Sequence, residues 1–373
     1  MAKATIKIAT TIMAAVFCFG SCRPDRGVNR TFDVRPKYGD RRIDLKKLYT
    51  LDVTNISLFA KESNPSLGGK IGFDRRDRTY ILDPWTASIS IFDESGRFVR
   101  SFGRNGQGPD EFSNPSSLFI KDDQIHVLHA FGHQLKILSL DGKYLSSLNV
   151  NQENPLRYYA AGDDIYLFSG KTERTFTHLD FILRRFEGGQ LEKEQILLTA
   201  PYPPGLRGPN VGSIWPNWLW ISSDGSFYFP EDNFRKYSIV KYDRDGRPEL
   251  LFGRTYEIRP YSEKARERII ADNAKTTSQG RVSVPAAPPL IANLFRDQRK
   301  NMWVISGETF EETEDPEFVN SVDVFSAKGG WLYSFKTKDV SKNSVYHNGK
   351  IFTLRPAEPV TEKQSIEVFE IRY

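Results

Sequence analysis

The chain has 373 residues, 13% aromatic side chains and a formal net charge of +5, a length that is normal for one large all-β domain. Its frequent Phe, Tyr, Ile and Val residues favour strands over helices. The positive charges are interleaved with acids, as in Asp74-Arg75-Arg76-Asp77-Arg78. This pattern argues against a nucleic-acid binder, which would cluster its Lys and Arg residues.

The N-terminus has the layout of a secretory signal peptide. Lys3 and Lys7 precede a short apolar run, Ala9–Gly20, which is the order of charged and apolar regions in such signals. The run is shorter than the roughly 20 apolar residues that cross a bilayer as a helix. We therefore expect residues 1–21 to be removed as a signal peptide and not to remain as a transmembrane anchor.

Cys22 stands directly after that expected cleavage site. The sequence Phe19-Gly20-Ser21-Cys22 resembles the lipobox of bacterial lipoproteins, with Phe19 in place of the usual Leu. The resemblance implies that Cys22 becomes the lipidated first residue of the mature chain, whereas the alternative is a Cys in an ordinary signal peptide. Cleavage there also removes Cys18, so the mature chain keeps no second cysteine for a disulfide.

A polar segment separates Cys22 from the rest of the chain. Residues 22–42 are predicted to be a flexible tether, and residues 43–373 are predicted to be one folded domain. The β-like run Ile43–Leu48 begins that domain but belongs to no complete repeat.

The remainder of the chain repeats one unit of strands and turns. In the clearest copy, Arg78–Asp83 and Ser88–Phe92 are β-rich runs, Asp93–Gly96 is a turn, and Arg97–Gly103 is a third run. Apolar residues in Ser88–Phe92 alternate with the period of two that a strand requires, and Asp-x-x-Gly between two runs is typical of a hairpin. Six copies are visible, with corresponding residues at Tyr80, His126, Tyr166, Tyr228, Trp303 and Phe352.

A ring of six such units needs a way to close. The last unit ends at Tyr373 after its third strand, whereas Ile43–Leu48 is a strand without a unit. If that N-terminal strand completes the last blade, the ring exposes no open edge of the kind that invites aggregation. We therefore predict an all-β, six-bladed β-propeller whose last blade is closed by an N-terminal strand. An open β-solenoid is the structural alternative.

The stretch Val99–Phe112, followed by Asn114-Pro115, resembles the linker between blades of NHL-type propellers. In particular, it is similar to a family of six-bladed propeller lipoproteins common in Bacteroidetes-like bacteria. The resemblance implies the fold and a cell-envelope location, and no particular reaction. From the residues themselves, we expect Asp110 and Glu111 to accept backbone hydrogen bonds and Phe112 to fill the seam between two blades. Phosphate binding is disfavoured, because no helix N-terminus follows and two acids lie in the loop.

The connections between strands differ in length according to the face that they occupy. On one face, here called the trimmed face, short turns join the first strand to the second and the third to the fourth. On the other, here called the loop-rich face, the long connections are Gly103–Pro115, Ser169–Thr177, Ala200–Asn217, Tyr256–Pro289, Ser306–Asn320 and Arg355–Lys363. Because binding residues tend to lie on loops held by a rigid scaffold, we predict that the loop-rich face is the functional one.

The loop-rich face also supplies the candidate ligand-binding residues. They are Tyr202, Arg207 and Trp215 in the proline-rich connection after Ala200, and Arg104 in the linker. Aromatic residues on a rigid loop suit stacking on sugars or holding a peptide. Trp218 and Trp220, at the expected start of an inner strand, are better explained by packing inside a blade.

Two further features lie in these long connections. Tyr256–Pro289 holds the one predicted helix, in which Tyr261, Ala265 and Ile269 recur every four residues. Its basic residues are expected to face solvent and not lipid. The acidic run Glu308–Glu317 lacks the alternating residues and central Gly of a calcium loop, so we interpret it as an acidic surface loop.

Motifs for catalysis are missing from the sequence. It has no G-x-S-x-G nucleophile pattern and no H-E-x-x-H zinc pattern. His126, His129 and His133 are close in sequence, but His126 and His129 would point to opposite sides of a strand. Some six-bladed propellers are lactonases with a central divalent ion, although no local pattern selects ligands here. The asparagines that can be imagined in such a site are Asn114, Asn217 and Asn293.

These observations lead us to expect a non-enzymatic binding propeller, with no catalytic residues, no cofactor and no nucleic-acid partner. Lipid at Cys22 would hold it at the outer membrane, periplasmic or surface-exposed, because Arg23 is not the Asp that retains some lipoproteins at the inner membrane. Its partner would be a carbohydrate, a peptide or an envelope protein. Two alternatives remain open: a hydrolase or lactonase with a divalent metal at the mouth of the central channel, and a structural subunit of an outer-membrane complex.

Overall fold

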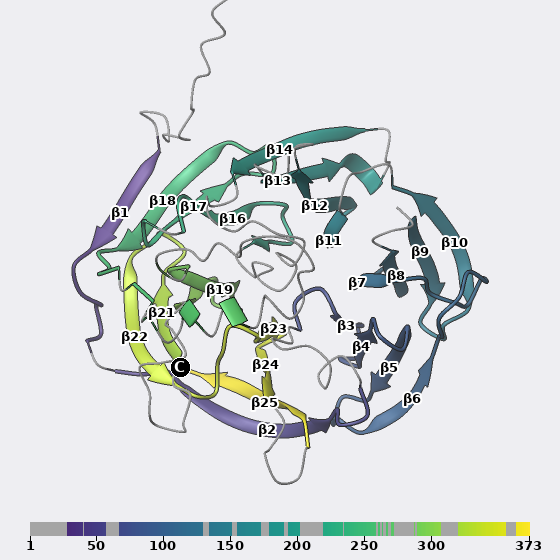
Figure 1. Ribbon diagram of the computed structural model, residues 1–373. Coiled ribbons are helices and arrows are strands. Elements are labelled where there is room, and N and C mark those ends of the chain that lie inside the picture. Colours follow the sequence, from purple (N-terminus) through teal and green to yellow (C-terminus); the bar gives the residue numbers. More distant parts are fainter. Residues whose placement is uncertain are drawn as a thin grey trace, which may run out of the picture.

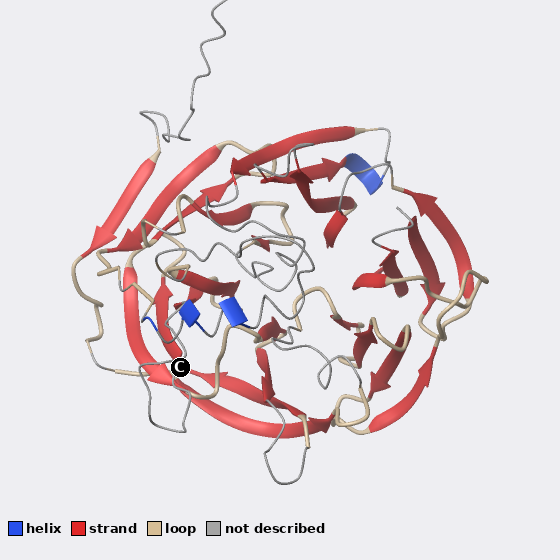
Figure 2. Ribbon diagram, viewed as in Figure 1, coloured by secondary structure: helices blue, strands red, loops and turns tan. Residues whose placement is uncertain are grey.

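Six four-stranded antiparallel sheets, one of which gains a fifth strand, are arranged as blades around a central axis in the computed structural model (Figure 1). Nearly all of the described secondary structure is β-strand, as Figure 2 shows. The six-bladed β-propeller predicted from the repeat is therefore confirmed. The structure describes residues 28–373 apart from 40, 57–66, 130–133, 151–154, 173–178, 190–192, 202–218, 234, 259, 262, 264–265, 268–269, 272–286, 288, 307–319 and 356–362.

The first three blades follow one another along the chain, each running from an inner strand at the axis to an outer strand at the rim. Blade 1 contains β3 (Ile71–Phe73), β4 (Thr79–Asp83), β5 (Ser88–Phe92) and β6 (Phe98–Phe102). Blade 2 contains β7 (Pro115–Lys121), β8 (Gln124–His129), β9 (Gln134–Ser139) and β10 (Tyr144–Asn149). Blade 3 contains β11 (Pro155–Ala161), β12 (Asp164–Thr172), β13 (Leu179–Phe186), the short 3₁₀ helix η1 (Glu187–Gly189) and β14 (Glu194–Pro201).

The next two blades continue the same order, and the last one takes its outer strand from the N-terminal part of the chain. Blade 4 contains β15 (Trp220–Ile221), β16 (Phe227–Pro230), β17 (Ser238–Tyr242) and β18 (Pro248–Arg254). Blade 5 contains β19 (Ile291–Arg296), β20 (Met302–Ser306), β21 (Asn320–Phe325) and β22 (Trp331–Thr337). Blade 6 contains β23 (Val345–His347), β24 (Lys350–Arg355), β25 (Ser365–Arg372) and the N-terminal strand β2 (Asp44–Asp52).

The ring closes where β2 pairs antiparallel with β25, from Asp44 opposite Arg372 to Asp52 opposite Ser365. This is the closure that the orphan N-terminal strand predicts. Leu51 in β2 is fully buried and packs with Ile366 and Val368 of β25 and with blade 1 residues such as Ile81. The closing strand therefore joins the hydrogen-bonded sheet of blade 6 and the apolar seam between blades 6 and 1.

The hydrophobic core consists of six clusters, each in the seam between two neighbouring blades. Each of the six corresponding residues identified from the repeat lies on the second strand of its blade, and none is more than 5% exposed. These residues are Tyr80, His126, Tyr166, Tyr228, Trp303 and Phe352. A large side chain at this position thus fills one seam per blade, which explains why it recurs in the sequence.

The structure differs from the predicted tether at β1 (Asn29–Asp33). This strand pairs in parallel with β18 and adds a fifth strand to the rim of blade 4. The chain then crosses to blade 5, where Asp33 Oδ2 accepts a hydrogen bond from the Trp331 N–H at 2.6 Å and the Tyr38 ring stacks on Tyr333. Local sequence did not predict this strand because its register depends on the edges of two blades more than 200 residues away.

Part of the predicted helix lies among the described residues. Glu263, Arg266, Glu267, Ile270 and Ala271 are helical and exposed. The predicted apolar positions Ala265 and Ile269 lie outside the described residues.

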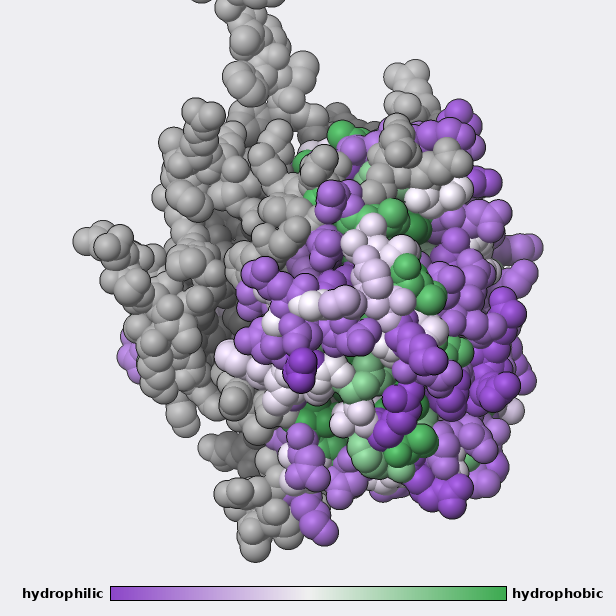
Figure 3. All heavy atoms as spheres, turned by 90° about the vertical axis from the view of Figure 1, so that its right-hand side faces the viewer, coloured by the Kyte–Doolittle hydropathy of each residue, from purple (hydrophilic) through white to green (hydrophobic). Residues whose placement is uncertain are grey.

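The rim over the outer strands β6 and β10 faces solvent. Figure 3 shows this side of the molecule to be mostly hydrophilic, with small separate hydrophobic patches. Exposed apolar side chains on these two strands include Phe98, Val99, Tyr144 and Leu145. Scattered exposed apolar residues of this kind are ordinary on a soluble surface.

Candidate functional site

The strand bounds reproduce the predicted division into two faces. Turns on the trimmed face, such as those between β3 and β4 or between β17 and β18, are short, whereas β14 and β15 or β18 and β19 are separated by long connections. Each inner strand begins at the loop-rich face, because the connection from the preceding blade arrives there. The first residues of the inner strands therefore lie at the loop-rich end of the propeller.

Most residues named as ligand-binding candidates lie outside the described residues. These are Tyr202, Arg207 and Trp215, as well as Trp218, Asn217, His133, Glu308–Glu317 and the lipidation candidate Cys22. Trp220, on β15, is half-buried and packs against the clusters of blades 4, 5 and 6, as expected for a tryptophan inside the propeller. Its indole ring lies edge-on to Tyr346.

Arg104 lies in the linker between blades 1 and 2, where it has a local partner. Its Nε donates to Glu111 Oε1 at 2.8 Å, although the Arg104 side chain is 80% exposed. Hydrogen bonding by the Gly108 N–H and then by Arg104 holds the pKa of Glu111 below its ordinary value. Asp110 accepts from the Tyr144 N–H at 3.2 Å, so both acids accept backbone hydrogen bonds as predicted.

The same linker is a plug between two blades. Phe112 is fully buried and packs with blade 1 and blade 2 residues, which confirms its predicted place in the seam. Gly103 has a φ of 89°, and a Cβ there would lie 2.4 Å from the Phe112 ring, so a larger residue would displace the plug. Lys136, on β9 of blade 2, holds the linker in place, because its Nζ donates to the Gly108 carbonyl at 2.6 Å and to the Glu111 carbonyl. The linker thus has a structural explanation that needs no phosphate.

The two described histidines of the cluster lie on opposite faces of blade 2, as predicted. The His126 ring stacks on Phe119, and the His129 ring meets Phe112 edge-on. Burial lowers the pKa of both histidines to about 4, so both are neutral at pH 7. Because they face different seams, they do not share a ligand.

Two of the three asparagines imagined for a lactonase-like metal site, Asn114 and Asn293, lie among the described residues. Asn114 precedes β7 in blade 2, and Asn293 lies on β19 in blade 5, on the opposite side of the ring. Asn293 Nδ2 donates to the Ser344 carbonyl at 2.7 Å. Within the described part of the chain, no three His, Cys, Asp or Glu side chains are placed to hold a metal ion.

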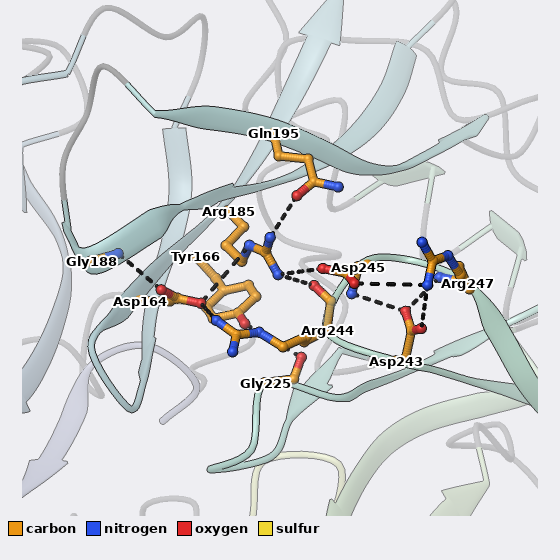
Figure 4. Close-up of polar contacts among 10 residues, drawn as sticks. All are labelled: Asp164, Tyr166, Arg185, Gly188, Gln195, Gly225, Asp243, Arg244, Asp245 and Arg247. Carbon is orange, nitrogen blue, oxygen red and sulfur yellow. Dashed lines mark hydrogen bonds and ion pairs between the residues drawn. The ribbon is translucent and has the colours of Figure 1, made fainter.

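A dense polar network lies on the trimmed face, between blades 3 and 4 (Figure 4). Asp164 accepts from the Gly188 N–H at 2.9 Å and from Arg244 Nη2 at 2.7 Å. Arg185 donates to the Arg244 carbonyl at 2.6 Å and to Asp245 Oδ1 at 3.0 Å. Each charge in this network has an opposite charge or a carbonyl beside it, so the network ties two blades together.

A different arrangement occurs at the loop-rich end of the inner strands. Ser117 on β7, Arg157 on β11 and Asn293 on β19 occupy equivalent positions, since each is the first residue after a bulge in the pairing with the second strand. All three are buried, at 0%, 9% and 4% exposure. Three of the six blades therefore place a buried polar side chain at the same inner-strand position.

Two of these three polar groups have no partner among the residues that the structure describes. Ser117 Oγ is enclosed and unpaired, and Arg157 is nine-tenths buried and forms no hydrogen bond or ion pair with another described residue. Both side chains meet at Gly69, just before β3 of blade 1. A Cβ on Gly69 would lie 3.3 Å from Arg157 Nε and 3.3 Å from Ser117 Oγ. The two polar atoms are therefore separated by no more than twice that distance.

The sequence analysis did not select Ser117, Arg157 or Gly69. The available signal was weak: Arg157 is a single charge beside Tyr158 and Tyr159 in a β-rich run. The position that Ser117, Arg157 and Asn293 share becomes visible only when the inner strands are aligned by the residues that they pair with on the second strands. That alignment requires the positions of the bulges, which the sequence does not give. Lys342, in the connection before β23, is a further cation at the loop-rich end, and burial lowers its pKa to about 8.

Comparisons with known proteins agree with the fold. Residues 40–187 match the model of a family described as a 6-bladed beta-propeller. Among solved structures, a Bacteroides fragilis protein described as exported is 10% identical, with 93% of this chain and 99% of that chain covered and a TM-score of 0.51. A duf4221 family member from Bacteroides vulgatus is 14% identical, with 89% and 98% covered and a TM-score of 0.49. No curated protein matches the chain. At such low identity, the likeness to the B. fragilis protein shows the shared fold alone.

Proposed function

We propose that this six-bladed propeller is a cell-envelope lipoprotein, anchored at Cys22, that binds its partner through the loop-rich face and performs no catalysis. The partner class is a carbohydrate, a peptide or an envelope protein. The anchor rests on the signal-peptide layout and on the resemblance of Phe19–Cys22 to a lipobox. No helix among the described residues is long and apolar enough to cross a membrane.

The observation that carries the proposal is the direction of β1. This strand runs parallel to β18, with Asn29 opposite Leu250 and Asp33 opposite Arg254. Since β18 starts at a trimmed-face turn and ends at the loop-rich face, Asn29 lies toward the trimmed face. We therefore expect the chain leading back to Cys22 to leave blade 4 on the side away from the long loops.

The distance available between anchor and propeller is short. Because β1 occupies part of the predicted tether, only Arg23–Val28 separates Cys22 from the strand. Six residues span at most about 20 Å when fully extended. A lipid on Cys22 would thus hold the trimmed face of blade 4 near the membrane and leave the loop-rich face open to a partner.

Replacing the lipidated residue tests the anchor. Cys22→Ser is expected to release the protein from the membrane fraction, because no other lipidation site or membrane-spanning segment is proposed for the mature chain. The measurement is fractionation of cells that express each form, with Cys18→Ser as the matched control that should stay membrane-bound. Membrane association of Cys22→Ser equal to that of the wild type would refute the anchor.

Thiol labelling tests the orientation. Ser223→Cys places a thiol in the exposed trimmed-face turn of blade 4, and Arg235→Cys places one in the exposed loop-rich connection of the same blade. In the lipidated protein on vesicles, a polymer-linked maleimide should label Ser223→Cys several-fold more slowly than Arg235→Cys. The two rates should become equal when Cys22→Ser is added to each variant. Slower labelling of Arg235→Cys on vesicles would overturn the proposed orientation.

A further inference from the structure

We infer that Arg157 and Ser117 form a binding site for an oxyanion, a carboxylate or a phosphate group, at the loop-rich end of the channel. The inference deepens the proposed function by naming the chemistry of the ligand, and it rests on that function only in taking the loop-rich face as the side of entry. Neither the histidine cluster nor the linker between blades 1 and 2 contributes to this site.

The first argument is the isolation of Arg157. Its side chain is nine-tenths buried, yet no acceptor in the described part of the chain receives a hydrogen bond from it. Other buried arginines of the propeller are paired: Arg254 donates to Asp323 at 2.7 Å, and Arg185 donates to Asp245 and Gln195. A buried charge without a partner is destabilising. The guanidinium of Arg157 is therefore available to pair with an anionic ligand.

The second argument is that donors from two blades meet beside a glycine of a third blade. Arg157 comes from blade 3, Ser117 from blade 2, and Gly69 precedes the inner strand of blade 1. The guanidinium presents N–H donors in a fork that matches two oxygens of a carboxylate or phosphate, and the unpaired Ser117 hydroxyl can donate a further hydrogen bond. These are the donors that one oxyanion requires.

The third argument concerns Gly69, which has a φ of 73° and no side chain beside the two donors. Any Cβ at this position would lie 3.3 Å from Arg157 Cγ, Arg157 Nε and Ser117 Oγ. A glycine therefore keeps the space beside the donors open, and its positive φ disfavours replacement. The backbone of Gly69 is itself fixed, because its carbonyl accepts a hydrogen bond from the Leu118 N–H at 2.6 Å.

The test uses the mature protein in detergent at low salt, titrated by calorimetry with sodium phosphate and, separately, with sodium acetate. We expect at least one of the two anions to bind the wild type. Arg157→Gln should weaken its affinity by roughly 10- to 100-fold, as expected for charge-assisted hydrogen bonds, and Ser117→Ala should weaken it several-fold. The matched control is Arg97→Gln, which removes an exposed trimmed-face arginine and should leave the affinity unchanged. Preference for phosphate or for acetate tells which oxyanion the ligand carries.

The ligand-free stability of Arg157→Gln separates a binding arginine from a structural one. Because Arg157 has no described partner, the substitution should leave the melting temperature unchanged or raise it, whereas loss of a structural arginine would lower it by several degrees. Binding of neither anion to the wild type, equal affinity of Arg157→Gln, or a lower melting temperature of that variant would each overturn the inference. The labelling of Ser223→Cys and Arg235→Cys is independent of these outcomes, so failure of the oxyanion site and failure of the proposed orientation can be told apart.

Discussion

Replacing Asp323 with alanine is expected to lower the free energy of unfolding by about 3–5 kcal/mol, the usual loss when one partner of a buried ion pair is removed. Asp323 is 1% exposed, and its Oδ2 accepts hydrogen bonds from Tyr237 Oη at 2.6 Å and from Arg254 Nε at 2.7 Å. Its Oδ1 accepts from Trp331 Nε1 at 3.2 Å. The substitution would leave the Arg254 guanidinium without its counter-charge and the Tyr237 hydroxyl without an acceptor, whereas Trp331 Nε1 keeps its hydrogen bond to the Tyr333 carbonyl at 3.0 Å.

The surroundings of Arg254 make it difficult for this side chain to move to a new position once Asp323 is removed. The guanidinium carbon lies 4.6 Å from the centre of the Tyr237 ring and 4.7 Å from that of Tyr256. Burial and then the neighbouring Asp323 raise the pKa of Tyr237 well above its usual value, so its hydroxyl remains a donor. The arginine therefore packs beside two rings that stack on each other, and turning it to solvent would break contacts in the seam between blades 4 and 5.

The measurement is urea-induced unfolding at pH 7. Asp243→Ala serves as the control, since Asp243 is a turn residue that accepts from the Asp245 and Arg247 N–H groups, and it should cost about 1 kcal/mol. If Asp323→Ala does not fold, Tyr237→Phe removes a single hydrogen bond to the carboxylate and should cost about 1.5–3 kcal/mol. If Asp323→Ala lowers the free energy of unfolding no more than Asp243→Ala does, the hydrogen bonds around Asp323 are not a major source of stability.

A variant that lacks β2, with residues 1–52 deleted, is expected to lose the folded monomer. Without β2, the whole length of β25 from Ser365 to Arg372 loses its outer partner and becomes an open edge, the kind of edge that pairs with other chains. The seam between blades 6 and 1 also loses Leu51, which is fully buried among apolar side chains. Because the ring closes at β2, loss of the β2–β25 pairing together with the Leu51 contacts should open the ring.

Size-exclusion chromatography and thermal unfolding followed by circular dichroism check this result. Deletion of residues 1–28 is the matched control, because it keeps β1 and β2 and should leave a monomer with an unchanged melting temperature. In the full chain, Leu51→Asp should lower stability through the same seam, since it buries an unpaired carboxylate. A monomeric deletion variant that melts like the control would contradict the closing role of β2.

Much of the fold was predictable from the sequence because strands and tight turns are encoded by neighbouring residues. The alternation in Ser88–Phe92 and the Asp-x-x-Gly turn that follows it identified two strands of blade 1 correctly. The recurrence of one large side chain per unit located the seams, and the leftover strand at Ile43–Leu48 indicated the closure. The burial of Phe112 between two blades was also predicted correctly, because a large aromatic side chain in a linker between blades is expected to be buried.

The candidate site was predictable only as a face. Connection lengths follow from the positions of the strands, so the division into a trimmed and a loop-rich face could be predicted without coordinates. The individual residues could not. Arg104 was selected for its place in the linker, where the structure pairs it with Glu111, whereas Arg157 carries no local pattern that sets it apart.

The sequence by itself determined the strands, their turns, the number of blades and the strand that closes the ring, since each of these depends on periodicity within a few residues. Only the tertiary structure decided that β1 joins the rim of blade 4, that Asp323 gathers donors from two blades, and that Arg157, Ser117 and Gly69 meet. These contacts join residues far apart in the chain, and their geometry follows from the bulges and the packing of whole blades. Such packing produces no periodic pattern of residues in the sequence of any one segment.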